Sequence, residues 1–204
     1  MTRKIAFVLF PGAEELDFVG PWEVFTMLGQ LVPGSCECYF VSEHGGEVKC
    51  AKGMRVLSDY SYANSPKPDV FVVPGGFATR EEKDNPATIA WVKEAAKSAE
   101  VSASVCTGSY ILQRAGLLAG KKATTHWFAM QEFIGLGNDF TAVTETRWVD
   151  EGNVITSAGV SAGIDMSLHL VGRLWTPEVG RRVQLAMEYF PAPPYEDVPL
   201  PTLG

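Results

Sequence analysis

The chain has 204 residues and is 46% hydrophobic, which suits one globular domain with a sizeable core. Its formal net charge is −7 and it has no basic cluster. Because contacts to phosphates need concentrated Lys and Arg, we expect no nucleic-acid partner. No apolar run approaches the ~20 residues of a membrane span, so we expect no membrane partner and a cytoplasmic location.

The N-terminal part of the chain predicts two strands, a helix and a hairpin. Residues 5–10 form a short apolar run that acids follow at once, which favours a buried strand over a signal peptide. A helix is expected over residues 20–31, because Pro21 suits a first helical turn. Residues 38–43 predict a second strand, and the segment around Gly53 predicts a hairpin.

The middle of the chain predicts two buried strands, each followed by a helix. Residues 70–73 are all apolar and end at the turn residues 74–76, Pro-Gly-Gly. A helix with an apolar face is expected over residues 84–100. Residues 101–105 predict the next buried strand, and a helix over 108–118 follows.

The C-terminal part predicts three strands and two helices. Residues 123–127 indicate a short strand, and two more strands are expected on either side of a turn at 150–153. Helices are expected over 161–175 and 176–189, the second capped by its first residue, a threonine followed by proline. The Pro-rich tail, residues 190–204, is expected to run extended over the surface.

The order of these elements predicts the fold class. Near-continuous apolar strands that alternate with helices are typical of a mostly parallel sheet covered on both faces. The sequence shows no internal repeat and no linker that would separate two domains. We therefore expect a single α/β domain over residues 1–204.

Three loops that follow strands carry the candidate chemistry. The first carries Glu14, Glu15 and Asp17, the second is the turn 74–76, and the third contains Cys106. In an open α/β sheet, ligands gather where the strands end and the strand order switches. We therefore expect these loops, which are distant in sequence, to meet at one edge of the sheet.

Cys106 lies between a predicted strand and a predicted helix, the geometry of a nucleophile elbow. The elbow motif is G-x-S-x-G, and the matching window here has Ser104 and Gly108 as its small residues and cysteine as its nucleophile. A helix N-terminus favours the thiolate, so we expect a lowered pKa for this thiol. The alternative is a small buried hydrophobic residue at the strand end.

The paired glycines Gly75 and Gly76 allow a ligand to approach the backbone closely. Together with the N–H of Thr107 they would form an oxyanion-type pocket for a substrate. The alternatives are a tight turn without a ligand and a Thr107 that supplies only its N–H and a hydroxyl cap.

Asp17 differs from the other acids of its loop. Glu14 and Glu15 are expected to be solvated, whereas Asp17 stands between two apolar residues and is expected to point inward. A carboxylate and a thiolate do not both ionise cheaply at close range, so they would share a proton. A protonated Asp17 would donate a hydrogen bond to the Cys106 thiolate and later deliver the proton to a substrate.

The other cysteines and the histidines give weaker signals. Cys36, Cys38 and Cys50 are expected to be free, reduced and mostly buried thiols. No cluster of cysteine and histidine has metal-ligand spacing, so no metal is expected. His126 is the only histidine near a predicted site edge, and a structural role beside Trp127 is favoured over a Cys–His pair.

Four blocks of the sequence, in order, resemble the ThiJ/PfpI superfamily, which is similar in fold to class I glutamine amidotransferases. These blocks are "PGAEELD", "VVPGG", "SVCTGS" and "LLAGKKATTHW". Further blocks resemble the isocyanide hydratase branch of the superfamily. They are "LDFVGPWEVF", "SVCTGSYILQRAGLLAGKKATTHW", "SAGVSAGIDMSLHLV" and "RVQLAMEYFPAPP".

The resemblance implies a flavodoxin-like three-layer sandwich, a homodimer and a reactive cysteine that works without a cofactor. It assigns the nucleophile to Cys106, the acidic partner to Asp17 and the glycine pair to Gly75 and Gly76. Proteases of the superfamily carry histidine directly after the cysteine. Thr107 stands there instead, which argues against peptidase activity.

The resemblance predicts a small-molecule substrate and leaves three functions open. The leading hypothesis is hydration of isocyanides to N-substituted formamides. The alternatives are glyoxalase or deglycase action on small dicarbonyls, and a redox- or ligand-sensing protein. Sensor domains of AraC-type regulators are also similar, but only the Pro-rich tail follows Tyr189, so DNA binding is not expected. Phe77, Trp127 and residues 159–161 are expected to line the pocket.

Overall fold

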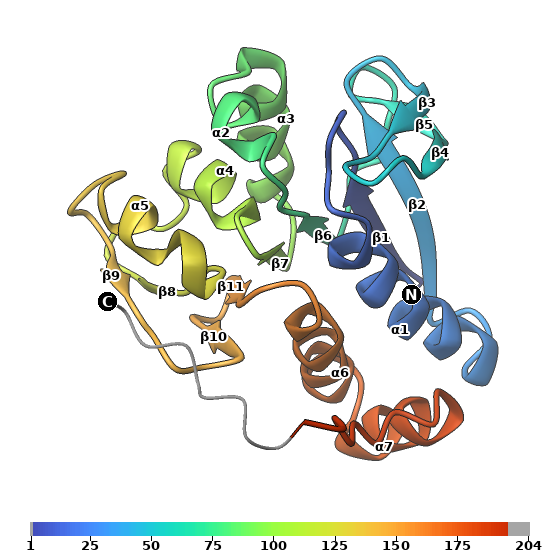
Figure 1. The fold of residues 1–204 in the computed structure, drawn as a ribbon. Coiled ribbons are helices and arrows are strands. Elements are labelled where there is room, and N and C mark those ends of the chain that lie inside the picture. The colour runs from blue at the N-terminus through green and yellow to red at the C-terminus, as the bar shows by residue number, and fades with distance from the viewer. Residues whose placement is uncertain (1, 196–204) are drawn as a thin grey trace.

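The computed structural model describes residues 2–195 and shows a three-layer α/β sandwich (Figure 1). Within these residues one seven-stranded sheet is parallel except at the pair β10–β11. In sheet order its strands are β10 (Trp148–Asp150), β11 (Val154–Ser157), β7 (Val101–Val105), β6 (Val70–Val73), β1 (Arg3–Val8), β2 (Cys36–Ser42) and β5 (Tyr60–Ser61). The predicted fold class is confirmed.

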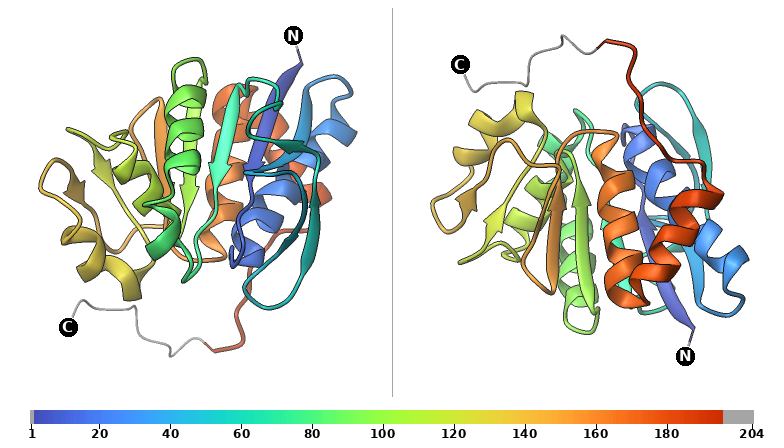
Figure 2. Two further views of the ribbon diagram at one scale, coloured as in Figure 1. Left: turned by 90° about the horizontal axis from the view of Figure 1, so that it is seen from above. Right: turned by 90° about the horizontal axis from the view of Figure 1, so that it is seen from below.

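Helices cover both faces of the sheet (Figures 1 and 2). One face carries α1 (Glu15–Leu31), α6 (Ala162–Leu174) and α7 (Pro177–Ala186), and the other carries α2 (Thr79–Glu82), α3 (Pro86–Ala96) and α4 (Gly108–Arg114). Smaller elements flank the two ends of the sheet, namely β3 (Gly46–Lys49), β4 (Arg55–Ser58), β8 (Lys122–Ala123), η1 (Trp127–Ala129), α5 (Met130–Ile134) and β9 (Thr141–Ala142). The hairpin predicted around Gly53 is the antiparallel pair β3–β4.

The core forms because the central strands are covered on both sides. All four residues of β6 and all five of β7 are buried, as their unbroken apolar or small-residue runs predict. Between the sheet and α1, the ring of Phe7 packs against Trp22 and Phe40, with centroids 5.4 and 6.0 Å apart. Burial of such rings dominates core stability and fixes the position of α1 on the sheet.

Helix α1 begins at Glu15, five residues before the start that the position of Pro21 predicted. Pro21 therefore lies inside the helix and leaves one backbone hydrogen bond unmade. Packing compensates for this loss, because Phe18, Val24 and Phe25 are buried on the same helix. As a consequence, Asp17 belongs to the first helical turn and not to a loop.

The strand predicted over residues 123–127 is only partly formed. Pairing ends after Ala123, because the next two residues are tied to the sheet edge by polar contacts instead. The N–H of Thr124 donates to Thr156 Oγ1 at 2.9 Å, and Thr125 Oγ1 donates to the carbonyl of Cys106 at 3.0 Å. These bonds bring the segment that leads to η1 beside the elbow.

The remaining predictions concern the C-terminal helices and the tail. Thr176 caps α7 as expected, accepting a hydrogen bond from the N–H of Val179 at 3.2 Å. The predicted tail, 190–204, lies largely outside the described residues. Between residues 2 and 195, none of the helices combines the length and the apolar character that a membrane crossing requires.

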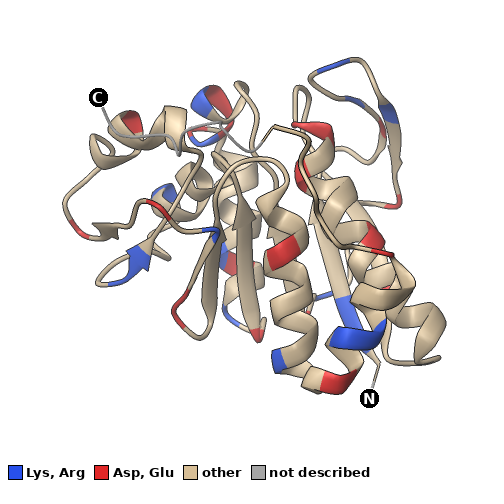
Figure 3. Ribbon diagram, turned by 60° about the horizontal axis from the view of Figure 1, so that its bottom comes forward, with Lys and Arg blue, Asp and Glu red and all other residues tan. Residues whose placement is uncertain are grey.

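Charged residues are spread over both helical layers. In Figure 3 the Lys and Arg positions are interspersed with Asp and Glu positions along the visible ribbon, without a stripe of one sign.

Candidate active site

Cys106 occupies a sharp turn between β7 and α4, so the strand–turn–helix geometry predicted for it is confirmed. Its φ is 56°, in the left-handed region that a non-glycine residue rarely adopts. The turn needs small neighbours, because a Cβ on Gly108 would overlap the carbonyl oxygen of Val73. The strained turn presents the sulfur at the carboxyl edge of the sheet.

Gly75 is the point at which the three predicted loops touch. A Cβ at this position would lie 2.6 Å from Thr107 N, 2.8 Å from Asp17 Oδ2 and 2.8 Å from Cys106 Cβ. Only glycine fits between these groups. The expectation that the three loops meet at one edge of the sheet is thus confirmed.

The amides of the glycine pair are already occupied by protein acceptors. Gly75 N–H donates to Asp17 Oδ2 at 2.8 Å, and Gly76 N–H donates to Thr107 Oγ1 at 3.0 Å. This differs from the expectation that both amides face a ligand. The N–H groups of Thr107 and Val160, together with the Thr107 hydroxyl, lie close enough to the Cys106 sulfur to lower its pKa. The glycine pair therefore positions the acid and the threonine.

Asp17 is fully buried, as predicted, and this burial sets its protonation state. Desolvation raises the pKa of Asp17 from 3.8 to about 8, against the lowering effect of the hydrogen bond from Gly75. Its Oδ1 has no full hydrogen bond among the described residues, although the Cys106 thiol is near enough to lower the carboxyl pKa. At neutral pH Asp17 is therefore mainly protonated.

The Cys106 thiol is not activated in the way that its helix N-terminus predicted. Burial and then the charge of Asp17 raise its pKa to about 12, and the N–H groups of Thr107 and Val160 only partly oppose this. Desolvation outweighs the helix terminus because the side chain is nearly enclosed. The resting pair therefore carries two protons. The two groups do not ionise together, as expected, but the predicted thiolate that shares one proton with Asp17 is not the resting form.

A cavity of about 280 Å³ opens in front of the Cys106 sulfur. Phe77, Trp127 and Phe128 form its aromatic rim, and their exposed fractions are 77%, 51% and 68%. The first two were predicted as pocket residues, whereas Phe128 was not, because nothing in the local sequence indicates that η1 turns over the elbow. The rim is suited to an apolar or aromatic ligand.

Glu14 and Glu15 are not solvated surface charges, contrary to expectation. Glu14 pairs with Lys52 and lines the cavity. Glu15 Oε1 accepts hydrogen bonds from the backbone N–H of Lys52 at 2.6 Å and of Met54 at 3.4 Å. Both acids are held inward because the β3–β4 turn supplies a cation and free amides to the start of α1.

His126 lines the same cavity as Cys106. Its Nδ1 accepts a hydrogen bond from the N–H of Phe128 at 3.1 Å, so the ring caps η1 and has the structural role predicted for it. Burial lowers the pKa of the imidazole, which favours the neutral ring. Besides its structural contact, His126 thus shares a cavity with the thiol.

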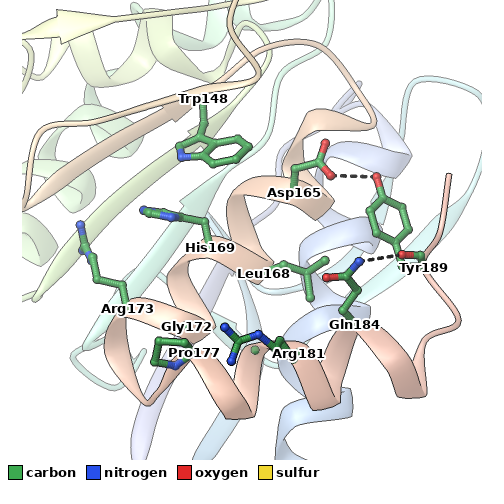
Figure 4. Close-up of a pocket in the computed structure, with 11 residues that line it drawn as sticks. Trp148, Asp165, Leu168, His169, Gly172, Arg173, Pro177, Arg181, Gln184 and Tyr189 are labelled. Carbon is green, nitrogen blue, oxygen red and sulfur yellow. Dashed lines mark hydrogen bonds between the residues drawn. The ribbon is translucent and has the colours of Figure 1, made fainter.

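A separate cavity of about 560 Å³ lies between β10, α6 and α7 (Figure 4). Its charged groups are paired: His169 Nε2 lies 2.7 Å from Asp150, Arg173 also binds Asp150, and Tyr189 donates to Asp165 at 3.0 Å. None of the predicted site residues lines it. We therefore place the candidate active site at Cys106.

The other thiols lie away from this site. Cys36, Cys38 and Cys50 are free, as predicted, but only Cys50 is buried, and the other two are half-buried on β2. Among residues 2–195, no group of three or more His, Cys, Asp or Glu side chains is arranged to hold a metal ion.

Comparisons with known proteins agree on one family. The sequence model of the DJ-1/PfpI family matches residues 3–173. The chain is 34% identical over 196 residues to an isonitrile hydratase of Pseudomonas putida, covering 96% of this chain and 82% of that protein. It is also 30% identical over 183 residues to the HTH-type transcriptional regulator CdhR of Pseudomonas aeruginosa, covering 90% of this chain and 54% of the regulator.

A solved structure is similar over nearly the whole chain. The crystal structure of a ThiJ/PfpI family protein from Pseudomonas syringae superposes with a TM-score of 0.87 at 33% identity, covering 96% of this chain and 78% of that one.

Proposed function

The chain belongs to the DJ-1/PfpI family, and we propose that within it the protein is a cysteine-dependent hydratase that converts isocyanides into N-substituted formamides without a cofactor. One observation carries the proposal: the carboxyl group of Asp17 is protonated and lies beside the nucleophile Cys106. The N–H of Gly75, which lies next to both residues, holds the carboxyl group in place. An isocyanide carbon must gain both a nucleophile and a proton. The pair supplies both at one point, and the similarity to an isonitrile hydratase supports this reaction.

The first step adds the thiol across the isocyanide carbon. A bond forms between the Cys106 sulfur and the terminal carbon, and Asp17 donates its proton to that carbon. The carboxylate that results takes up the thiol proton. The product is a thioimidate, R–N=CH–S–Cys106, and Asp17 is protonated again. The raised pKa values of Asp17 and Cys106 disfavour a state in which both groups are charged. Proton exchange between the two groups avoids that state.

The second step hydrolyses the thioimidate. Water adds its oxygen to the thioimidate carbon while the nitrogen takes a proton from Asp17, which recovers a proton from the water. The tetrahedral intermediate then expels the Cys106 sulfur, and the hydroxyl proton returns through Asp17 to the thiol. The N–H groups of Thr107 and Val160 stabilise the departing sulfur. The net reaction is R–NC plus water to R–NH–CHO.

The test is turnover of cyclohexyl and phenyl isocyanide by the purified protein, followed as formamide formation by NMR. Cys106→Ala and Asp17→Asn should each reduce turnover by about 10²-fold or more, the scale of lost nucleophilic or acid–base catalysis. Cys36→Ala is the matched control, since this half-buried thiol lies on β2 away from the cavity. Full activity in Cys106→Ala, or no turnover by the wild type, would overturn the proposal.

A sensing role is the second candidate, favoured by the similarity to the regulator CdhR. A sensor would bind ligand or oxidise at Cys106 without turnover. Mass spectrometry after mild peroxide, run beside the isocyanide assay and a methylglyoxal assay, separates the classes. Gain of two oxygen atoms without any turnover favours the sensor, and methylglyoxal consumption alone favours a glyoxalase.

A further inference from the structure

Two cavities meet at one wall beside the elbow. The cavity at Cys106 measures about 280 Å³, and a second one measures about 370 Å³. Both are lined by His126, Trp127 and Val160. The first alone is near the lower limit for small-molecule sites, about 300 Å³, whereas the two together fall well within the usual range.

The imidazole of His126 is seated directly on Gly159. A Cβ at position 159 would overlap His126 Cδ2 and lie 2.8 Å from Nε2 and 2.9 Å from Cγ. The backbone of Gly159 does not have a left-handed φ, so glycine is required there for space and not for conformation. The absence of a Cβ at Gly159 leaves room for the ring in the wall that the two cavities share.

The ring is fixed on one side only. Its Nδ1 accepts the N–H of Phe128, whereas the structure shows no partner for Nε2 among residues 2–195. Burial lowers the pKa of the ring, which favours the neutral form. Because Nδ1 accepts a hydrogen bond, Nε2 carries the proton, and it lies against the backbone of Gly159. Rotation of this side chain would break one hydrogen bond, the one from the N–H of Phe128.

The two cavities differ in chemistry. The first has the aromatic rim described above, whereas the second is lined by four threonines: Thr124 and Thr125, which are buried, and Thr144 and Thr146. The hydroxyls of Thr125 and Thr146 already donate to backbone carbonyls, so toward a ligand they can act as acceptors. Hydroxyl groups can both donate and accept hydrogen bonds, so they suit a neutral polar group and not an unpaired charge. Of the charged residues in this lining, Arg147 is paired with Asp165, and the exposed Glu145 carboxylate can accept a hydrogen bond from a hydroxyl or an amide N–H.

We propose that His126, seated on Gly159, divides the active site into two compartments, and that the second is a subsite for the polar end of a long N-substituent. The preferred substrate is then an isocyanide with an apolar segment beside the reacting carbon and a terminal hydroxyl or amide. This inference rests on the proposed function. Gly159 and His126 become specificity-determining residues, although neither touches the reacting atoms.

The test compares methyl, n-hexyl and 6-hydroxyhexyl isocyanide by kcat/KM. The wild type should prefer the hydroxylated chain to the plain chain of equal length by about tenfold, the scale of one satisfied hydrogen bond. In Gly159→Ala the added methyl group occupies the space that the His126 ring now takes. This variant should reduce kcat/KM for both long substrates by about tenfold or more, but kcat/KM for the methyl compound by less than about threefold.

His126→Asn should act in the opposite direction. Asparagine keeps the cap on η1 but is smaller, so the wall opens and kcat/KM for the hexyl substrates should rise relative to the methyl compound. Gly172→Ala is the matched control, because its Cβ would meet only an ordinary contact at 3.8 Å. A length dependence that neither Gly159→Ala nor His126→Asn changes would overturn the inference, even if one of the two folds poorly.

Binding to Cys106→Ala separates this inference from the proposed function. Calorimetric titration with N-(6-hydroxyhexyl)formamide and N-methylformamide needs no turnover. Tighter binding of the long formamide that Gly159→Ala abolishes supports the subsite even if no isocyanide is hydrated. Turnover of isocyanides without such a difference would leave the hydratase proposal intact and overturn the subsite.

Discussion

At the scale of single residues, burial sets the protonation state of Asp17. Its inward position was predictable from the apolar residues on either side of it. Its hydrogen-bond partner was not, because the contact with Gly75 joins positions 58 residues apart and depends on how β6 and α1 sit on the sheet. For the same reason, the raised pKa of Cys106 could not be predicted from a local helix N-terminus, since burial by distant segments decides it.

The first prediction concerns the pH dependence of turnover. If Asp17 is the acid, activity requires its protonated form, which is present below its pKa of about 8 and lost above it. We expect kcat/KM to fall tenfold per pH unit well above pH 8. Rate measurements from pH 5 to 10 test this, and a profile that is flat through pH 9 would exclude Asp17 as the proton donor.

The second prediction concerns stability. Because burial raises the folded-state pKa of Asp17 above its ordinary value of 3.8, the folded state binds more protons between pH 4 and 8. The contribution of Asp17 to the free energy of unfolding is fully present below about pH 4. It falls as pH rises to about 8, by about 1.4 kcal/mol for each pH unit.

Asp17→Asn removes this pH-dependent loss and keeps a carbonyl oxygen for Gly75. Urea unfolding should therefore show the variant to be the more stable protein at pH 8 and to have a similar stability at pH 4. A wild type that is as stable as Asp17→Asn at pH 8 would contradict the raised pKa.

At the scale of elements, the sequence pattern predicts the type and the order of helices and strands better than it predicts where they begin and end. The buried strands β6 and β7 were predicted residue for residue, because apolar or small-residue runs bounded by turns have no competing interpretation there. The start of α1 was misplaced, because a proline inside a helix is normally costly and here packing compensates. The short helices α2, α5 and η1 carry no periodicity that a sequence pattern could show.

The third prediction tests a predicted cap. Thr176→Ala removes the oxygen that accepts the N–H of Val179, so α7 should lose about 1 kcal/mol of stability. Urea unfolding measures this loss, and Thr176→Ser, which keeps the hydroxyl, is the control. Equal losses in both variants would show that the methyl group and not the cap matters.

At the scale of the whole molecule, the sheet order places the three site loops together. The strand pairs β1–β6 and β6–β7 are parallel, so the ends of these neighbouring strands meet at one edge. This arrangement was predictable from the alternation of elements. The paired cavities were not, because their wall depends on a glycine and a histidine 33 residues apart, Gly159 and His126.

The fourth prediction concerns assembly. We propose that the protein is a homodimer, as its family resemblance implies, and note that Leu16, Met54 and Leu57 expose apolar surface, Leu57 to 73%. Light scattering during size-exclusion chromatography should give twice the monomer mass. A monomer mass at micromolar concentration would contradict the proposal.

The doubly protonated pair also has a consequence for unwanted chemistry. A thiol whose pKa is near 12 holds very little thiolate at neutral pH, so general alkylating agents should find it a slow target. A partner that needs a proton as it is attacked is different, because Asp17 supplies that proton at the same moment. The site would thus react faster with electrophiles that need a proton as the sulfur attacks them than with electrophiles that do not. The Cys106 thiol would stay unreactive until an electrophile of the first kind is bound.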